Sequence, residues 1–286
     1  MQVNILLIHI RFPENQNAHP MIRKICLAAL LLIAVSCSTV PITGRKQLSL
    51  VSSQQMMALA KDQYSTTLQQ SNLSDDDREV RRLRQVGDRI IRSVETYLRQ
   101  KGQGELLRGY NWEINLIQDD QMVNAWAMPG GKIAFYTGIM PLFANDDELA
   151  VVMAHEIAHA IASHGGERMS QMLVAQLGGV ALDVALSNKP QQTRQLAQVA
   201  YGFGSQVGIL LPFSRTHESE ADELGLYFMT MAGYKPEASV DFWRKMAAQG
   251  GGSPPEFLST HPSNQTRINN LRRLIPEAKR RYGGRN

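Results

Sequence analysis

The sequence is poor in cysteine, in net charge and in long N-terminal apolar runs, and each shortage excludes a class of protein. Only Cys26 and Cys37 occur in 286 residues, so a zinc site built from several thiolates is excluded. A formal net charge of +4 gives no basic footprint, and no nucleic-acid partner is expected. The N-terminal apolar run, residues 25–35, is shorter than the roughly 20 residues that a bilayer-spanning helix needs.

The first 36 residues have the pattern of an export signal. Arg23 and Lys24 precede the apolar run, which ends in small residues before Cys37. This order is typical of a lipoprotein signal cleaved immediately before the cysteine, and a plain secretory signal is the alternative. We therefore expect a signal peptide over 1–36, translated from Met21, and a lipid on Cys37. The expected location is the periplasmic side of a bacterial envelope, held by this lipid, with the outer membrane favoured over the inner.

Residues 37–50 form the expected tether, and residues 51–286 have a length that fits one folded domain. Hydrophobic patterns and turn residues predict the elements of this domain. Helices are expected over 52–70, 75–100 and 264–274, strands over 112–118, 123–128 and 132–137, and a flexible loop over 250–255. The fold class is therefore predicted to be α+β and mainly helical, with a small sheet or hairpin.

The most informative stretch is His155-Glu156-Ile157-Ala158-His159, which lies in an apolar run that predicts a helix. Two histidines four residues apart project about 40° from each other on a helix and can bind one ion together. Glu156 projects roughly 100° from His155, where it can accept a proton from water instead of ligating the ion. This arrangement is typical of zinc-dependent hydrolysis, in which neutral imidazoles hold the ion and a carboxylate is the general base.

A further ligand is expected from the acidic segment 213–225, which an apolar stripe predicts to be helical. Glu218 and Asp222 are four residues apart and share one helix face. Glu218 can bind the ion while Asp222 accepts the outer N–H of a ligating histidine. Ala221 is small enough to let the two metal-binding helices pack closely. The alternative for this segment is an exposed acidic helix face.

These two motifs resemble the metallopeptidase family that includes HtpX, the CAAX prenyl endopeptidases and the periplasmic proteases BepA and LoiP. Two more motifs follow the family order, N-A-W-A-M-P-G-G at 124–131 and H-P-S-N-Q-T-R at 261–267. The resemblance implies a zincin-like fold that binds one Zn²⁺ through His155, His159 and Glu218. It also implies that Glu156 is the general base and that Asp222 supports a ligand from behind.

The other two motifs are expected to serve the substrate. Asn124, Ala125 and Trp126 begin a hairpin whose free edge would hold an extended polypeptide, and a hairpin that merely packs on the helix is the alternative. His261 is expected either to stabilise the oxyanion or to act as a fourth ligand that shuts the enzyme off, a switch thought to operate in some relatives. Arg267, like Asp222, is expected to lie behind the metal ligands. It would anchor this loop or contact the substrate carbonyl.

The segment between the two metal-binding helices reads as two more helices, over 167–187 and 191–211, rich in methionine, alanine and glycine. Several glutamines and Asp183 interrupt their apolar content. This composition favours a buried core element or a mobile cover over the cleft, and it argues against a membrane span.

These features predict a zinc metalloendopeptidase of the bacterial envelope that hydrolyses misfolded or misassembled envelope proteins. Its partners would be polypeptide substrates, the membrane and envelope assembly machinery, and this role rests on the resemblance. The alternative is a non-catalytic chaperone or assembly factor for outer-membrane proteins that uses the same cleft. Glu156 argues against it, because holding a chain needs no general base. A structural zinc lipoprotein fits less well, since structural sites are usually closed and rich in thiolates.

Overall fold

The structure is a computed structural model that describes residues 37–248, 256–261 and 265–284. Residues 38–286 form one compact unit, to which the following description applies. The expected signal peptide (1–36), the expected loop over 250–255 and the middle of the H-P-S-N-Q-T-R motif (262–264) lie outside the described residues.

A three-stranded sheet forms the β part of the unit. β3 (Glu113–Ile117), β5 (Lys132–Tyr136) and β4 (Ala125–Met128) lie in the order β3-β5-β4. β5 runs parallel to β3 and antiparallel to β4, so β4 is an edge strand. Gly131 in the β4–β5 turn has φ +84°, and a Cβ there would lie 2.6 Å from the Trp112 ring, so this tight turn requires glycine.

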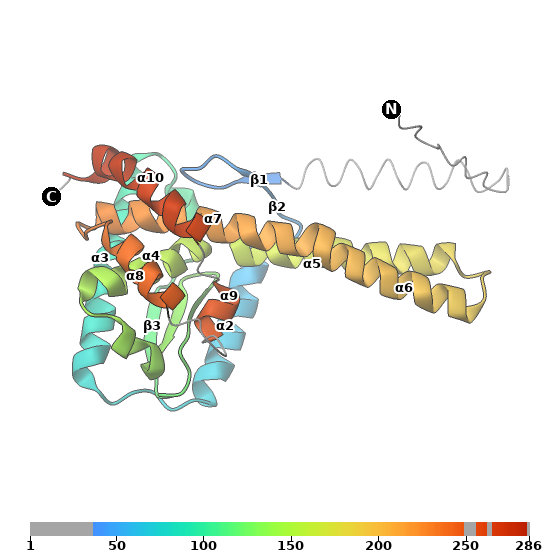
Figure 1. Cartoon of the computed structure of the whole chain (residues 1–286), viewed down its shortest axis with the longest axis horizontal. Coiled ribbons are helices and arrows are strands. Elements are labelled where there is room, and N and C mark those ends of the chain that lie inside the picture. Colours follow the sequence, from blue (N-terminus) through green and yellow to red (C-terminus); the bar gives the residue numbers. More distant parts are fainter. Residues whose placement is uncertain (1–36, 249–255, 262–264, 285–286) are drawn as a thin grey trace. The chain divides into compact units, whose positions relative to one another are not determined.

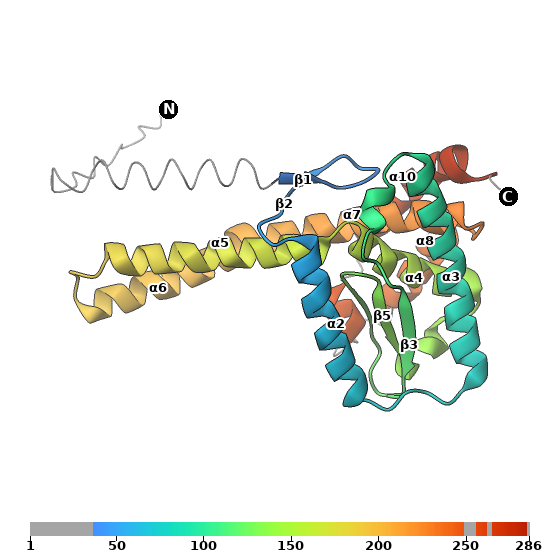
Figure 2. The same cartoon turned by 180° about the vertical axis from the view of Figure 1, so that it is seen from behind.

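Two amphipathic helices flank this sheet, as the sequence predicts. α2 (Ser53–Gln69) begins with a capping box between Ser52 and Gln55, and α3 (Asp77–Gln100) is capped by Asp76. Figure 2 shows β3 and β5 lying between α2 and α3. A two-stranded sheet of β1 (Cys37–Thr39) and β2 (Lys46–Leu48) precedes α2, and the short helix η1 (Gly104–Leu107) follows α3.

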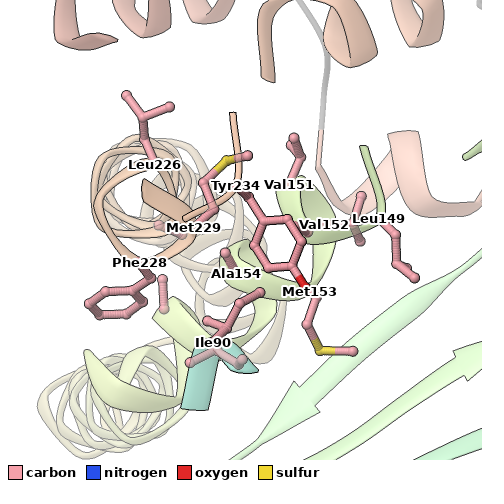
Figure 3. Packing of buried hydrophobic residues seen from close by; sticks show 14 of the residues in the cluster. Ile90, Leu149, Val151, Val152, Met153, Ala154, Leu226, Phe228, Met229 and Tyr234 are labelled. Carbon is pink, nitrogen blue, oxygen red and sulfur yellow. The ribbon is translucent and has the colours of Figure 1, made fainter. Parts of the chain in front are cut away.

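The centre of the unit is the pair of helices that carries the metal-binding motifs, α4 (Asp146–Ile161) and α7 (Leu211–Met231). Asn145 caps α4, and acidic residues in its first turn complement the helix dipole. Ala221 is fully buried between the helices, and a Cβ on Gly225 would lie 3.0 Å from the backbone nitrogen of His155. Small residues therefore allow the close approach that the sequence predicts. Figure 3 shows side chains of α4 and α7 packed with Ile90 of α3.

The C-terminal helices close the core around this pair. η2 (Thr137–Leu142) leads into α4, and α8 (Ala238–Ala248), α9 (Glu256–Thr260) and α10 (Gln265–Tyr282) follow α7. α10 is longer than the predicted helix over 264–274. Its last turn is held by Tyr282, whose ring contacts Tyr97 of α3 and Tyr227 of α7. The predicted α+β, mainly helical fold class is thus confirmed.

The segment between α4 and α7 is helical, but the prediction that it belongs to the core is wrong. α5 (His164–Ala185) and α6 (Gln191–Ser205) run side by side and extend beyond the sheet, and the π-helical turn η3 (Gln206–Leu210) joins α6 to α7 (Figure 1). None of the described side chains from Met172 to Thr216 is buried. The apolar composition of these helices can be read from the sequence. The sequence does not show whether other parts of the chain cover them, which is why the core prediction failed.

Candidate metal centre

Four side chains from distant parts of the chain converge on one point. The Nε2 atoms of His155 and His159 on α4 are 3.1 Å apart. The Glu218 carboxylate on α7 lies 3.4 Å from His155 Nε2 and 3.3 Å from His159 Nε2. Nδ1 of His261, directly after α9, lies 3.1 Å from His155 Nε2 and 2.8 Å from Glu218 Oε2. These four side chains offer donor atoms that all lie within 4.8 Å of one another.

This donor set fits zinc. Zinc takes imidazole nitrogen and carboxylate oxygen at about 2.0–2.2 Å in tetrahedral geometry, which separates neighbouring donors by roughly 3.3–3.6 Å. The distances among His155, His159 and Glu218 are close to that range. A cation bound between them would also explain why three imidazoles can pack closely around one carboxylate. The helical i, i+4 spacing and the Glu218 helix therefore bring together the side chains that the sequence predicts as zinc ligands.

Glu156 projects beside the ligands and not into their midst. Its side chain is buried, and Oε1 has no hydrogen-bond partner among the described residues. The nearest ionisable group to this oxygen is His261, whose Nε2 lies 3.5 Å away. Burial raises the pKa of Glu156, and the neighbouring His261 and His155 oppose the rise. A buried oxygen without a partner, facing the cleft, is placed to accept a proton from a group that arrives with the substrate.

The ionic state of the ligands is set by their contact with one another. Burial lowers the pKa of His155, but hydrogen bonds to Asp222 and Glu218 outweigh it and raise the value to about 9. The three surrounding imidazoles hold the pKa of Glu218 far below its usual range, although burial opposes this. The raised pKa favours the protonated form of His155 when no ion is bound, and metal binding at Nε2 would displace that proton.

His155 is held from behind by a carboxylate and a guanidinium. Its Nδ1 lies 3.1 Å from Asp222 Oδ1, and Arg267 Nη2 lies 2.5 Å from the same carboxylate oxygen. The Arg267 guanidinium also stacks 3.5 Å from the centroid of the Trp243 ring. With its outer N–H donated to Asp222, His155 presents Nε2 as the metal-binding atom. The structure thus brings Asp222 and Arg267 together behind the ligands.

His159 is held from behind by a longer relay that the sequence analysis missed. α4 ends at Ile161, and Ser163 adopts a left-handed conformation (φ 56°) that turns His164 back toward His159. Nδ1 of His164 lies 2.8 Å from Nδ1 of His159, and its Nε2 lies 3.0 Å from Glu220 Oε2. Arg45 Nε donates to the same Glu220 oxygen at 2.8 Å. His164 therefore contacts a candidate ligand directly.

A second carboxylate completes this relay. Arg45 also forms a two-point ion pair with Glu167, at 3.0 and 2.6 Å, and His217 Nε2 lies 2.9 Å from the same carboxylate. Burial raises the pKa of Glu167, but the bonds to His217 and Arg45 outweigh it and lower the value to about 2. His217 stacks on the His164 ring. The His217 side chain is buried and contacts Glu167 and His164 instead of the candidate metal ligands.

The candidate substrate cleft runs along the edge strand beside the ligands. Asn124, Ala125 and Trp126 line the same cleft as Glu156 and His159. β4 pairs only with β5 among the described strands, so its other backbone edge is open to an extended chain. No residue of 169–213 lines this cleft within the described structure. The described structure therefore gives no support to the prediction that this segment covers the cleft.

Replacing His164 by phenylalanine is expected to lower zinc affinity by roughly 10- to 100-fold, measured by competition with a chromophoric chelator. Phenylalanine keeps the ring but cannot accept the outer N–H of His159. The matched control is His217→Phe, a buried histidine of the same cluster that contacts no ligand and should keep zinc affinity in the folded protein. Equal losses in the two variants would assign the effect to the cluster as a whole and not to the direct contact between His164 and His159.

Comparison with known proteins gives a consistent result. The model of the family described as peptidase family M48 matches residues 78–275, which contain all four ligand candidates. Mitochondrial metalloendopeptidase OMA1 of Saccharomyces cerevisiae is 36% identical over 184 residues, covering 62% of this chain and 51% of the relative. Human metalloendopeptidase OMA1 is 29% identical over 249 residues, covering 83% of this chain and 46% of the relative.

A bacterial relative is also similar. The beta-barrel assembly-enhancing protease of Yersinia pestis is 32% identical over 169 residues, covering 57% of this chain and 34% of the relative. The matched part of the chain thus covers about half or less of each relative's own length. The share is 51% for the yeast protein, 46% for the human protein and 34% for the Yersinia pestis protein. The similarity includes both mitochondrial and bacterial proteins, so it does not by itself fix a cellular location.

Proposed function

Because the chain belongs to peptidase family M48, we propose that it is a zinc-dependent metalloendopeptidase that hydrolyses polypeptides of the bacterial envelope. The observation that carries this proposal is the convergence of His155, His159, Glu218 and His261, with the unpartnered oxygen of Glu156 beside them. A structural zinc site would have no use for a buried carboxylate that is kept out of the ligand set.

His155, His159 and Glu218 would hold the ion, since their donor atoms are fixed from two rigid helices. Zinc, when bound, supplies the Lewis acidity that activates water and the scissile carbonyl. The two support systems, Asp222 behind His155 and His164 behind His159, orient the imidazoles so that each presents Nε2.

Glu156 is the proposed general base. It would accept a proton from the attacking water and pass that proton to the nitrogen of the leaving amine as the peptide bond breaks. Its pKa is raised by burial, which makes the carboxylate a better base near neutral pH than an exposed glutamate. The side chain is on the rigid helix α4, so its distance from the ligands is fixed by the backbone.

His261 has two proposed roles, and its position supports the inhibitory one. Nδ1 of His261 lies 3.1 Å from His155 Nε2 and 2.8 Å from Glu218 Oε2, within the ligand group and not beside it. In this position it fills the place where water or substrate would enter. A shift of His261 away from Glu218 would open that place and leave its imidazole near enough to donate to an oxyanion.

The substrate proposed for this site is an extended segment of an unfolded or misassembled protein. The open edge of β4 binds backbone and not side chains, so it would favour chains that lack secondary structure of their own. The name of the Yersinia pestis relative associates that protein with β-barrel assembly. By analogy, envelope proteins that fail to assemble are the proposed substrates, and assembly machinery is the proposed partner.

The envelope location is proposed from the N-terminal sequence. Arg23 and Lys24, the apolar run and Cys37 have the order of a bacterial lipoprotein signal. Cys37 is exposed at the start of β1 and forms no disulfide, which supports a lipid on its sulfur. A periplasm-facing lipoprotein, in the outer membrane in preference to the inner, is the proposed form.

Removal of zinc tests the proposed activity. Dialysis of the full chain against a chelator is expected to abolish cleavage of an unfolded substrate such as casein, and added zinc should restore it. Metal content and cleavage rate are measured on the same samples, since the proposal requires both to rise and fall together. Magnesium added in place of zinc is the control. Cleavage that persists in metal-free protein would refute the proposal.

A further inference from the structure

The helical hairpin formed by residues 169–214, called here the α5–α6 hairpin, has hydrogen-bonding side chains between its helices and large apolar side chains on its outer faces, where Gln176, Gln195 and Gln206 are also exposed. Between the two helices, Gln198 Nε2 donates to Gly179 O at 2.9 Å and Tyr201 Oη donates to Ala175 O at 2.8 Å. A Cβ on Gly178 would lie 2.1 Å from Tyr201 Oη, so the helices meet through glycine. Contact through small residues and interhelical hydrogen bonds is typical of helix pairs in lipid.

The outward faces of both helices carry large apolar side chains. On α6, Leu196, Val199 and Phe203 expose 72%, 71% and 73% of their surface. On α5, Leu177 and Val184 expose 66% and 68%. None of the described side chains from Met172 to Thr216 is buried, so the hairpin has no core of its own. An apolar surface of this extent is not stable in water without a covering layer.

The charges of the hairpin lie at its two ends. At its root, where it meets the metal-binding helices, Arg168 and Arg215 are exposed. At its tip, Asp183 pairs with Arg194 at 2.7 Å and Lys189 is exposed. The 20 residues between Arg194 and Arg215 carry no charge, and the continuous helical stretch Gln191–Met231 contains an 18-residue window that is apolar enough to cross a membrane.

We propose that the α5–α6 hairpin inserts into a lipid bilayer, contrary to the expectation from its composition that it would not span a membrane. The hairpin has charged residues at both ends and an uncharged band between them. A bilayer has the same order, with an apolar core between two polar headgroup layers, whereas an apolar groove on a protein does not require charges at both ends. The uncharged stretch 195–214, which covers most of α6, η3 and the first turn of α7, has the length of about 20 residues that a hydrocarbon core requires. The root arginines would lie among the headgroups.

This insertion would be a membrane contact separate from a lipid on Cys37, and it does not depend on peptidase activity. It would also place the cleft close to the membrane surface, because Arg168 and Ser214 at the hairpin root line the cleft together with Glu156 and His159. Substrate segments that emerge from the bilayer would then reach the cleft directly.

The test uses residues 38–286, which form a compact unit and contain no cysteine, so neither the signal nor a lipid contributes. A polarity-sensitive fluorophore is attached to Phe203→Cys on the hairpin, or to Leu106→Cys on η1 as the exposed control. With vesicles of phosphatidylethanolamine and phosphatidylglycerol, we expect a blue shift and quenching by brominated acyl chains at position 203 only. The triple variant Leu196→Ser, Val199→Ser and Phe203→Ser should bind vesicles at least roughly tenfold more weakly.

A second triple variant, Leu59→Ser, Leu73→Ser and Leu106→Ser, removes three exposed apolar side chains outside the hairpin and should bind vesicles normally. Absence of vesicle binding would overturn the proposal. A blue shift that appears without lipid, together with a doubled mass in light scattering, would also overturn the proposal. The hairpin would then be covered by a second copy of the chain. Zinc content and casein cleavage of the same samples report on the proposed activity separately.

Discussion

Replacing Glu156 by glutamine is expected to lower the rate of polypeptide cleavage by about 10²- to 10⁴-fold while the bound zinc is retained. Glutamine has the same shape and, like glutamate, leaves the ligands untouched, but its amide cannot accept the proton of the attacking water. The measurements are the single-turnover cleavage rate of an unfolded polypeptide and the zinc content of the same protein. A variant that keeps its zinc and its thermal transition but loses cleavage would identify Glu156 as the base.

The matched control for Glu156→Gln is Glu148→Gln. Glu148 is a second buried glutamate on α4, but it accepts from the Ala144 backbone and pairs with Lys245, away from the cleft. This variant should cleave at the normal rate in its folded state, although its stability should fall because a buried ion pair is broken. If Glu156→Gln cleaved as fast as Glu148→Gln, another group would have to be the base.

Replacing Glu218 by glutamine is expected to remove zinc binding and, with it, all measurable cleavage. Glu218 is the single carboxylate among three imidazoles, and it is therefore the source of negative charge in the ligand group. A neutral amide cannot balance the ion, and we expect the zinc affinity to fall by more than about 100-fold. Chelator competition measures this affinity, and thermal unfolding with and without zinc shows whether the variant folds.

Asp222→Asn on the same helix is the graded comparison. The Asp222 carboxylate touches His155 Nδ1 but no other ligand candidate, so the asparagine variant should lose only about 10- to 100-fold in zinc affinity. The order of affinities should therefore be wild type, Asp222→Asn, then Glu218→Gln. An Asp222→Asn variant weaker than Glu218→Gln would mean that the roles assigned to these two carboxylates are reversed.

The ligand group could be predicted from the sequence because helical spacing fixes it locally. His155 and His159 face the same way on any α-helix, and Glu218 and Asp222 do so on another, so only the packing of two helices remained open. The small residues Ala221 and Gly225 allow the two helices to pack closely, and the role of Ala221 was predicted from the sequence. The strands of the small sheet were predicted within one or two residues, but the parallel pairing of β3 with β5 depends on a crossover that periodicity cannot show.

The parts that could not be predicted depend on contacts between distant segments. Arg45 and Glu220 are 175 residues apart in the sequence, and no local pattern links them. His164 lay five residues after His159, which on a continuous helix would turn it away. The left-handed Ser163 redirects it, and a serine in that conformation has no reliable sequence signal. The α5–α6 hairpin shows the same limit, since apolar composition is common to a protein core and to a lipid-facing surface.

The contact between Arg45 and the two glutamates has a consequence for how the molecule matures. Arg45 lies only eight residues after Cys37, in the stretch that the sequence presents as a simple tether, yet it is hydrogen-bonded to Glu167 and to Glu220 and through them to the support of His159. A mature protein that holds its metal ion firmly would therefore need to keep this arginine. A chain trimmed beyond Arg45 would be expected to hold its metal ion less firmly, because Glu220 and Glu167 would lose the cation that they share.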